Sequence, residues 1–402
     1  IENVSLGRSQ FLHGGVFLIY IVEKGDTLEK ISERTGVPVW KIVYDNQIEN
    51  RDRIAQGQAL LLLQAGENGG LAEGKETGGY AYPFIEPAVL GQALPSLRKL
   101  LVFSWGFTFE GTLVPPPQDD LWMTETARKQ GAEPILVLTP FSGGAFNNQL
   151  VKVLVENEML QDKVTDELLA AVSDRGYAGV NIDFEYVLPE SRVRYAEFIG
   201  KLRTKMNRNG YRVSVAVAPK ISDSQKGLLV EGIDYALLGE NADAVFLMTY
   251  EWGYTYGPPM AVAPLDKVRE VVEYAVSRIP AGKLILGIPN YGYDWPLPYE
   301  KGITRARTVG NAEAAGIAAE NGAVIEYARM SQAPWFTYKK SGIEHVVWFE
   351  DPRSIEAKWS LVKEYELAGA WYWNLMRIFR ANWLMMGSEQ TGEKDGLEKQ
   401  GI

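Results

Sequence analysis

Cysteine is absent from this chain of 402 residues, and histidine occurs only as His13 and His345. The lack of cysteine excludes a disulfide framework, thiol catalysis and iron–sulfur ligation. Two isolated histidines do not supply a histidine-based metal site or a Ser-His-Asp triad. We therefore expect no metal and no other cofactor, so any catalysis must come from other side chains.

Excess positive charge and long apolar runs are also missing. The formal net charge is −10, whereas a nucleic-acid partner requires a basic surface that displaces counterions. The apolar run at 15–22 is too short to cross a membrane, and it lacks the basic start and small-residue cleavage site of a signal peptide. We expect no nucleic-acid partner and no membrane span, and the export route stays open.

Aromatic residues, by contrast, are plentiful, with 11 Trp and 20 Tyr. Aromatic rings stack on the apolar faces of sugars, although protein cores use the same residues. Hydrophobic residues at 46% and charged residues at 23% are ordinary values for a folded globular protein. The composition is thus compatible with a globular carbohydrate-binding protein.

Residues 18–64 are expected to form a small unit of strand, helix, helix and strand. Asp26 is the expected N-cap of the first helix, with Glu29 three residues later and Gly36 as the C-terminal stop. Pro38 opens the second helix. Fewer than fifty residues bury little apolar surface, so this unit should be marginally stable alone.

The same unit resembles a LysM module. The resemblance is carried by the Gly-Asp-Thr-Leu turn, by Asn46 in the second helix and by Gly57-Gln58 before the last strand. LysM modules bind N-acetylglucosamine-containing glycans in a groove between the first turn and the loop before the last strand. The resemblance therefore implies glycan-binding roles for Gly25, Asp26, Thr27 and Ile54.

The rest of the chain predicts an α/β fold. Residues 1–17 are read as an N-terminal extension, 65–79 as a glycine-rich linker and 391–402 as a tail. Within 80–390, apolar strand-like runs alternate with amphipathic helical stretches, which predicts a (β/α)8 TIM barrel with a small α+β insertion near 296–350. The predicted strands are 80–85, 100–108, 133–141, 179–187, 212–219, 244–251, 284–292 and 369–375.

The fourth predicted strand, GVNIDFEYV, contains the candidate active site. Its even-numbered residues are apolar, whereas Asn181, Asp183 and Glu185 alternate with them and should point into the barrel. Barrel interiors are normally filled by branched apolar side chains, so a polar stripe there is costly unless it is used. An edge strand with solvent-facing acids is the alternative, but the neighbouring residues are too apolar for it.

The segment AGVNIDFE resembles the Asp-Gly-x-Asp-x-Asp-x-Glu motif of glycoside hydrolase family 18. Gly179, Asp183 and Glu185 match this motif, while Ala178 and Asn181 replace its two leading aspartates. Three later segments, FLMTYEW, GIPNYG and GAWYWN, resemble the strand-six, strand-seven and strand-eight motifs of the family. They contain Met248 and Tyr250, Tyr291, and Trp373.

The resemblance implies a role for each residue. Glu185 would be the general acid, Asp183 would orient the substrate's acetamide, and Tyr250 would donate a hydrogen bond to it. Trp373 would lie beneath the distorted sugar. The remaining substrate-binding positions are Asn181, Met248 and Tyr291. Each aromatic residue could instead be an ordinary core residue, and Asn181 cannot share a proton as the replaced aspartate could.

The combination of a LysM-like module with a family-18-like barrel resembles the LysM-plus-family-18 enzymes that degrade the spore cortex of bacteria. We therefore predict a glycosidase that cleaves β-1,4 bonds after N-acetylglucosamine in peptidoglycan, located in the cell wall or at the spore surface or cortex. A chitinase acting on chitin-type glycan is the alternative enzyme. A non-catalytic wall-binding lectin is the second alternative, although retention of both carboxylates argues against it.

Overall fold

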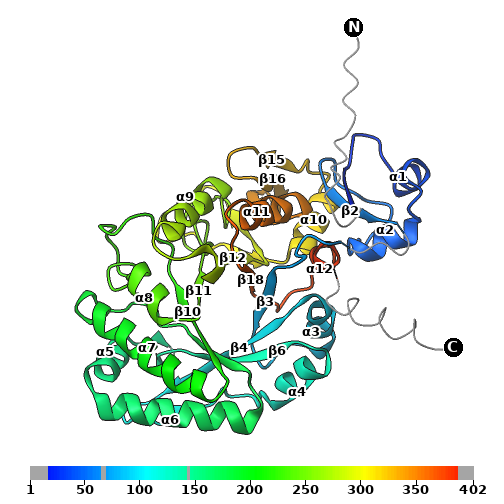
Figure 1. Ribbon diagram of the computed structural model, residues 1–402. Coiled ribbons are helices and arrows are strands. Elements are labelled where there is room, and N and C mark those ends of the chain that lie inside the picture. Colours follow the sequence, from blue (N-terminus) through cyan, green and yellow to red (C-terminus); the bar gives the residue numbers. More distant parts are fainter. Residues whose placement is uncertain (1–16, 65–68, 143–144, 388–402) are drawn as a thin grey trace, which may run out of the picture.

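The computed structural model describes residues 17–64, 69–142 and 145–387. The predicted tail and all but the last residue of the predicted N-terminal extension lie outside these ranges. Within the described residues, no helix has both the length and the apolar composition that crossing a membrane requires. The described chain forms a small N-terminal module placed beside a large barrel (Figure 1).

The N-terminal module has the predicted strand–helix–helix–strand order. Its two strands pair in antiparallel fashion, and Gly36 ends the first helix with a φ of 74°. Asn46 joins the second helix to the last strand, because its side chain exchanges hydrogen bonds with both backbone groups of Leu61. The elements are β1 (Phe17–Ile21), α1 (Leu28–Thr35), α2 (Val39–Asp45) and β2 (Ala59–Leu63).

The predicted N-cap of α1 is wrong by one residue. Thr27, not Asp26, has the extended backbone of the cap, and its hydroxyl accepts a hydrogen bond from the backbone N–H of Lys30. The Asp26 carboxylate instead accepts hydrogen bonds from the Tyr20 hydroxyl and the Glu23 backbone N–H, both at 2.8 Å. Asp26 therefore closes the turn between β1 and α1.

Eight parallel strands form the closed barrel, and barrel strands that are consecutive in the sequence pair with one another. The last strand, β18, pairs with the first, β3, and this pairing closes the barrel. All eight predicted strands are present, although the first lies at Glu76–Ala81 and shares only its last two residues with the predicted 80–85. They are β3 (Glu76–Ala81), β4 (Lys99–Phe107), β6 (Glu133–Leu138), β9 (Gly179–Ile182), β10 (Arg212–Val217), β11 (Ala244–Leu247), β12 (Leu284–Pro289) and β18 (Gly369–Trp373).

Helices follow the strands and form the outer layer. They are α3 (Pro87–Ala93), α4 (Leu121–Lys129), α5 (Asn148–Glu156), α6 (Glu158–Arg175), α7 (Arg192–Arg208), α8 (Tyr235–Asn241), α9 (Leu265–Val276), α11 (Pro352–Glu364) and α12 (Arg380–Met386). Three short 3-10 helices accompany them, at Leu94–Ser96, Pro189–Ser191 and Ala281–Lys283. Short strands near the mouth of the barrel are β5 (Leu113–Val114), β7 (Phe141–Ser142) and β8 (Ala145–Phe146).

The predicted α+β insertion lies between β12 and α11. It is an antiparallel sheet in the order β14-β13-β17-β16-β15, and it begins four residues before the predicted boundary. Its elements are β13 (Gly292–Pro296), β14 (Arg307–Val309), α10 (Asn311–Glu320), β15 (Glu326–Ala328), β16 (Ala333–Lys340) and β17 (Ile343–Trp348).

The predicted linker is largely part of the folded barrel. β3 begins at Glu76, and Leu71 is buried. The backbone N–H groups of Gly70 and Leu71 donate hydrogen bonds to the carbonyl of Met385 in α12. A Cβ on Gly69 would lie 2.1 Å from that same carbonyl oxygen. Gly69 therefore allows two backbone segments to approach closely. A glycine-rich composition is the same in a closely packed segment and in a flexible linker, so composition alone predicted the linker.

Strand β2 of the small module is buried on both faces. Leu60 and Leu62 pack with Ile31 and other apolar residues in a core that belongs to the module. Leu61 and Leu63 belong to the main hydrophobic core, and β2 contacts the barrel helices α11 and α12. The module is therefore packed onto the barrel, as Figure 1 shows at α12.

Backbone contacts fix this packing. Gly57 has a φ of 81°, and a Cβ there would lie only 1.9 Å from the carbonyl oxygen of Ile325 in the insertion. The Ile325 N–H donates a 2.8 Å hydrogen bond to the Gln56 carbonyl. Gln47 accepts a 2.6 Å hydrogen bond from the backbone N–H of Arg380 at the start of α12. The module is thus held at two separate places along its chain, at Gln47 and at Gln56–Gly57.

Candidate active site

Strand β9 ends at Ile182 and is therefore shorter than the predicted 179–187. Asp183 and Glu185 lie in the loop that directly follows it. Phe184 points the other way and packs against Tyr195 and Phe198 of α7, with ring centroids 5.7 and 6.4 Å apart. The expected alternation of inward and outward side chains therefore continues beyond the strand. Because Phe184 packs against the outer helix, Asp183 and Glu185 on either side of it point toward the barrel axis.

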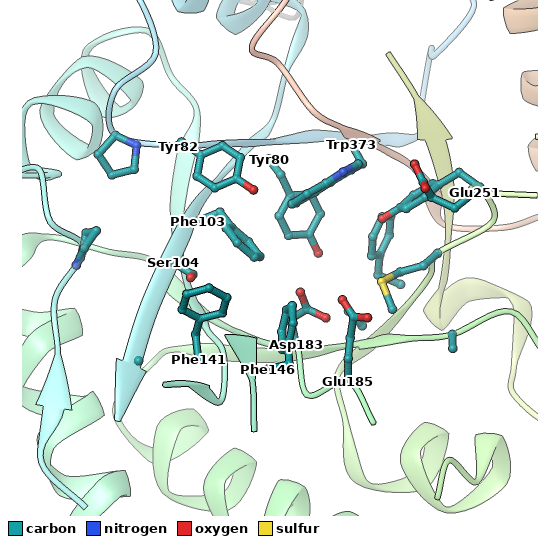
Figure 2. Close-up of a pocket in the computed structure, with 18 of the residues that line it drawn as sticks. Tyr80, Tyr82, Phe103, Ser104, Phe141, Phe146, Asp183, Glu185, Glu251 and Trp373 are labelled. Carbon is teal, nitrogen blue, oxygen red and sulfur yellow. The ribbon is translucent and has the colours of Figure 1, made fainter. Parts of the chain in front are cut away.

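A cavity of about 610 Å³ opens above these carboxylates at the C-terminal end of the barrel. This is the end at which active sites of (β/α)8 barrels lie. Figure 2 shows Asp183 and Glu185 pointing into the cavity. Five of the seven predicted barrel-site residues line it: Asp183, Glu185, Met248, Tyr250 and Trp373.

The two carboxyl groups have strongly perturbed acidity. Burial, and then the negative charge of Glu185, raise the pKa of Asp183 well above its usual range. Burial and the charge of Glu251 raise the pKa of Glu185 to about 7. Oδ1 of Asp183 is buried and accepts no hydrogen bond from any described residue. At neutral pH the pair therefore retains a proton that Glu185 can donate.

Glu251 is a third carboxylate in the cavity, and the sequence reasoning missed it. Its backbone has a φ of 67°, and its carboxylate accepts hydrogen bonds from the Tyr291 and Tyr293 hydroxyls. Burial raises the pKa of Glu251, and these two hydrogen bonds oppose the rise. A signal was available, because Glu251 directly follows Tyr250 at the end of a barrel strand.

Tyr291 and Asn181 lie behind the cavity wall, although both were predicted to bind substrate. Tyr291 is buried and reaches the cavity only through Glu251. Asn181 is fully buried, where its Oδ1 accepts a 3.0 Å hydrogen bond from the Tyr80 hydroxyl and its Nδ2 donates a 2.9 Å bond to Ser214. Both residues therefore support side chains in front of them instead of facing the cavity.

Trp373 lies across the cavity from the two carboxylates in the view of Figure 2. Its ring is in edge-on contact with Phe103, Tyr80 and Tyr82, at centroid distances of 5.0, 5.5 and 6.1 Å. These contacts fix the plane of the indole. The cavity thus has an acidic side and an aromatic side, an arrangement suited to holding a sugar ring between them.

An apolar flank of the cavity was not predicted. It is assembled from the loops after β3, β4 and β6, and its residues are Tyr82, Pro83, Phe84, Val114, Pro115, Pro116, Pro117, Phe141 and Phe146. Phe84 and Phe141 are exposed, at 58% and 47% of their surface. The run of three prolines and the YAYPF segment were visible signals, but their meeting at one wall depends on the closed barrel.

A second cavity, of about 450 Å³, lies at the groove of the small module. Asp26, Thr27 and Ile54 line it, as predicted from the LysM resemblance, together with Ala319 and Glu320 of α10. Gly25 does not line it. The Asp26 carboxylate is already occupied by the hydrogen bonds that close its turn, and the Thr27 hydroxyl accepts the capping hydrogen bond from Lys30. Of these three residues, Ile54 therefore has the side chain free to meet a ligand.

The described residues contain no group of three or more His, Asp or Glu side chains arranged to hold a metal ion. Asp183, Glu185 and Glu251 share one cavity but are not grouped as ligands. The chemistry that the arrangement offers directly is proton transfer by Glu185, next to a second carboxyl group and opposite an aromatic wall.

Comparisons with known proteins agree with this geometry. The model of glycosyl hydrolases family 18 matches residues 121–377, and the LysM domain model matches residues 20–62. The cortical fragment-lytic enzyme of Bacillus subtilis is 34% identical, over 92% of this chain and 97% of its own.

Solved structures give the same answer. The Bacillus cereus spore cortex-lytic enzyme SleL superposes with a TM-score of 0.86 at 30% identity, covering 92% of this chain and 97% of that one. A chitinase from Chromobacterium violaceum superposes with a TM-score of 0.70 at 26% identity, covering 78% and 98%. With these matches and the two carboxyl groups at the mouth of a closed barrel, the chain belongs to glycosyl hydrolases family 18 and carries a LysM domain ahead of its catalytic barrel.

Proposed function

We propose that this protein is a β-N-acetylglucosaminidase that cleaves β-1,4 bonds after N-acetylglucosamine in peptidoglycan of a bacterial cell wall or spore cortex. The observation that carries the proposal is Glu185, a carboxyl group with a pKa of about 7 beside Asp183 in a cavity walled by Trp373. Relatives named for lysis of cortical fragments match along nearly the whole chain, and this supports the choice of glycan.

The proposed chemistry is substrate-assisted and retains the anomeric configuration. Glu185 gives its proton to the glycosidic oxygen as that bond breaks, while the acetamide oxygen of the same sugar attacks the anomeric carbon. A water then attacks that carbon, loses its proton to Glu185 and reopens the cyclic intermediate. Asp183 and Tyr250 orient the acetamide and stabilise the positive charge that develops on it.

The direction of attack follows from the shape of the cavity. A separate nucleophile or water-activating carboxylate must lie across the sugar from the acid. Trp373 lines the wall opposite Glu185 in Figure 2, and the other lining carboxylates are Asp183 and Glu251. Asp183 follows the same strand as Glu185 and enters from the same side, and the Glu251 carboxylate is held by the Tyr291 and Tyr293 hydroxyls. The acetamide is therefore the best-placed attacking group.

Asn181 alters how the proton is stored. Its amide is held by Tyr80 and Ser214, and an amide cannot accept a proton from Asp183. The partner that remains for Asp183 is Glu185, whose charge raises its pKa. We therefore assign the proton of the unliganded protein to the Asp183–Glu185 pair, and none of it to Asn181.

A product analysis tests the function. Purified cortex fragments and chitin oligomers are incubated separately with the protein, and the product masses identify the bonds that are cleaved. We expect cortex fragments to be cut after N-acetylglucosamine. Preferential cleavage of chitin oligomers would support the alternative of a chitinase, which the likeness to the Chromobacterium violaceum enzyme favours. Binding without cleavage of either glycan would support a lectin.

The stereochemistry tests the mechanism separately. NMR of the fresh product should detect the β anomer first, and a thiazoline mimic of the cyclic intermediate should inhibit. Initial release of the α anomer would contradict the mechanism, as would equal turnover of a substrate that lacks the acetamide. The outcome does not depend on which glycan is preferred.

A further inference from the structure

A cleft of about 410 Å³ lies between the LysM module and the α+β insertion, away from the active-site cavity. One wall is the segment that follows α2, and the other is α10 with Arg307 and Lys340 of the insertion's sheet. Figure 1 shows α10 on the side of the insertion that faces the module. The contacts of Gly57 and Gln47 hold the module in place, so the cleft is formed before any ligand enters.

The two walls carry opposite charges that have no partner. Glu49 of the module and Lys340 of β16 both line the cleft and are exposed. Neither side chain forms an ion pair or a hydrogen bond with another described residue. Arg307 and Glu313, in contrast, form an ion pair with each other at the same cleft. The free charges are complementary to a ligand that carries both a carboxylate and an amine.

The inner end of the cleft contains buried polar atoms without partners. A smaller cavity of about 30 Å³ adjoins the cleft, and Gln58 and Ala312 line both. Asn311 Nδ2 and Glu350 Oε1 line this end, are buried, and form no hydrogen bond with any described residue. Leaving such groups unpaired is costly, so a donor and an acceptor at one place match a ligand group that has both. An amide is such a group, and its size suits the space.

The cleft offers little to a sugar ring. The described residues that line it include no aromatic side chain, although aromatic rings are the surfaces on which sugars stack. Its floor is made of small residues of α10, where a Cβ on Gly316 would meet no atom within 4 Å. The cleft adjoins the groove of the module, with which it shares Arg53 and Glu320. A peptide attached to a glycan in that groove would therefore reach the cleft.

We propose that this cleft binds the short peptide stem of peptidoglycan, while the module's groove and the barrel hold the glycan. An uncrosslinked stem has amide groups, free carboxylates and a side-chain amine. The amides match the unpartnered Asn311 and Glu350 atoms, and the charged groups match Lys340 and Glu49. The inference rests on the proposed function, because it takes its ligand from the same polymer, but it adds a separate site.

Binding of the free stem tetrapeptide to the whole chain with Glu185→Gln, measured by calorimetry, tests the proposal. We expect Gly316→Phe in this background to weaken binding at least about tenfold, because the added ring occupies the cleft. Gly91→Phe is the matched control, since Gly91 of α3 is also a helical glycine whose Cβ would meet no atom within 4 Å. It should leave the affinity unchanged. Chitotetraose, which has no peptide, should bind both variants equally.

Two further variants test the charges without disturbing the packing, since both residues are exposed. Lys340→Gln and Glu49→Gln should each weaken tetrapeptide binding about two- to fivefold, the usual size of an exposed ion pair. Absence of tetrapeptide binding, or equal affinities of Gly316→Phe and Gly91→Phe, would overturn the proposal. Tighter binding of an all-L peptide of the same composition would assign the cleft to a protein segment and would overturn it too.

The proposed function and the peptide cleft fail differently. If cortex fragments are cleaved but the tetrapeptide does not bind, the proposed function stands and the cleft is wrongly assigned. If the tetrapeptide binds in the cleft but no peptidoglycan is cleaved, the proposed function is wrong and the peptide site stands. The Gly316 and Gly91 pair separates loss of the site from a general effect of adding a ring to a helix.

Discussion

Asp26 in the LysM module and Asp183 in the barrel are both aspartates that follow a strand, and both were predicted as site residues. Burial raises the pKa of each, but at Asp26 hydrogen bonds from the Glu23 backbone, Tyr20 and Arg34 outweigh it and lower the pKa. Asp183 receives no such bond at Oδ1, and its pKa is raised well above the usual range.

The difference separates structural from reactive carboxylates. A fully partnered carboxylate is stabilised in its charged form and holds the chain around it, as Asp26 holds its turn. A buried carboxyl group without partners is stabilised in its protonated form, which is the form that an acid catalyst needs. We therefore expect the LysM module to contribute position and binding surface, and the barrel to contribute the acid.

The largest effect should come from removing the acid itself. We expect Glu185→Gln to lower turnover of soluble glycan fragments by about two to four orders of magnitude, the usual contribution of a positioned general acid. The control is Glu190→Gln, a nearby exposed glutamate, which should leave turnover nearly normal. Near-normal turnover by Glu185→Gln would contradict its assignment.

The second prediction asks whether the LysM module unfolds with the barrel. Leu62 packs in the core of the module, and Leu63 packs in the main core. Each substitution to alanine should cost about 2–5 kcal/mol of stability. Because β2 joins both cores, calorimetry should detect a single unfolding transition that moves down in both variants. A separate early transition in Leu62→Ala alone would indicate a tethered, independent module.

The third prediction concerns pH. Activity should fall as pH rises through about 7, because Glu185 then loses the proton that it must donate. Glu251→Gln removes the charge that helps to raise this pKa, so the alkaline limb of the kcat/KM profile, which reports the free enzyme, should move to lower pH by about one unit or less. An unmoved limb, or one moved to higher pH, would contradict the role of Glu251.

Folding stability gives a check that does not depend on turnover. The folded-state pKa of Glu185 is raised from 4.5 to about 7. Between these two values the folded protein binds more protons than the unfolded chain, so this contribution to stability is lost as pH rises from about 4.5 to 7. Denaturant unfolding of Glu185→Gln should show a smaller loss over that range than the unmodified protein.

The smallest effect is expected in the LysM module. Asp26→Asn removes a charged acceptor that serves Tyr20, Glu23 and Arg34. It should lower the free energy of unfolding by about 1–2 kcal/mol, the usual range for hydrogen bonds to a charged group. The exposed Asp52 provides the matched control, since Asp52→Asn should change stability by less than about 0.5 kcal/mol. Equal effects would mean that Asp26 is not the structural residue described above.

The sequence by itself determined the order of the elements, the (β/α)8 class and the direction of the polar stripe. These depend on the alternation of apolar residues within single strands and helices, which is a local property. The side toward which Asp183 and Glu185 point could be predicted because Phe184, between them, is an apolar residue that had to face the outer helices.

Only the tertiary structure decided which carboxylates have partners. Tyr80 reaches Asn181 across 101 positions of the chain, and Tyr291 reaches Glu251 across 40. The apolar flank likewise requires three loops to meet, and the packing of β2 on the barrel requires α11 and α12. Burial depends on distances in space, so the largest cause of the raised pKa of Asp183 and of Glu185 follows from closure of the barrel, whereas the lowered pKa of Asp26 follows from partners within eight residues of it.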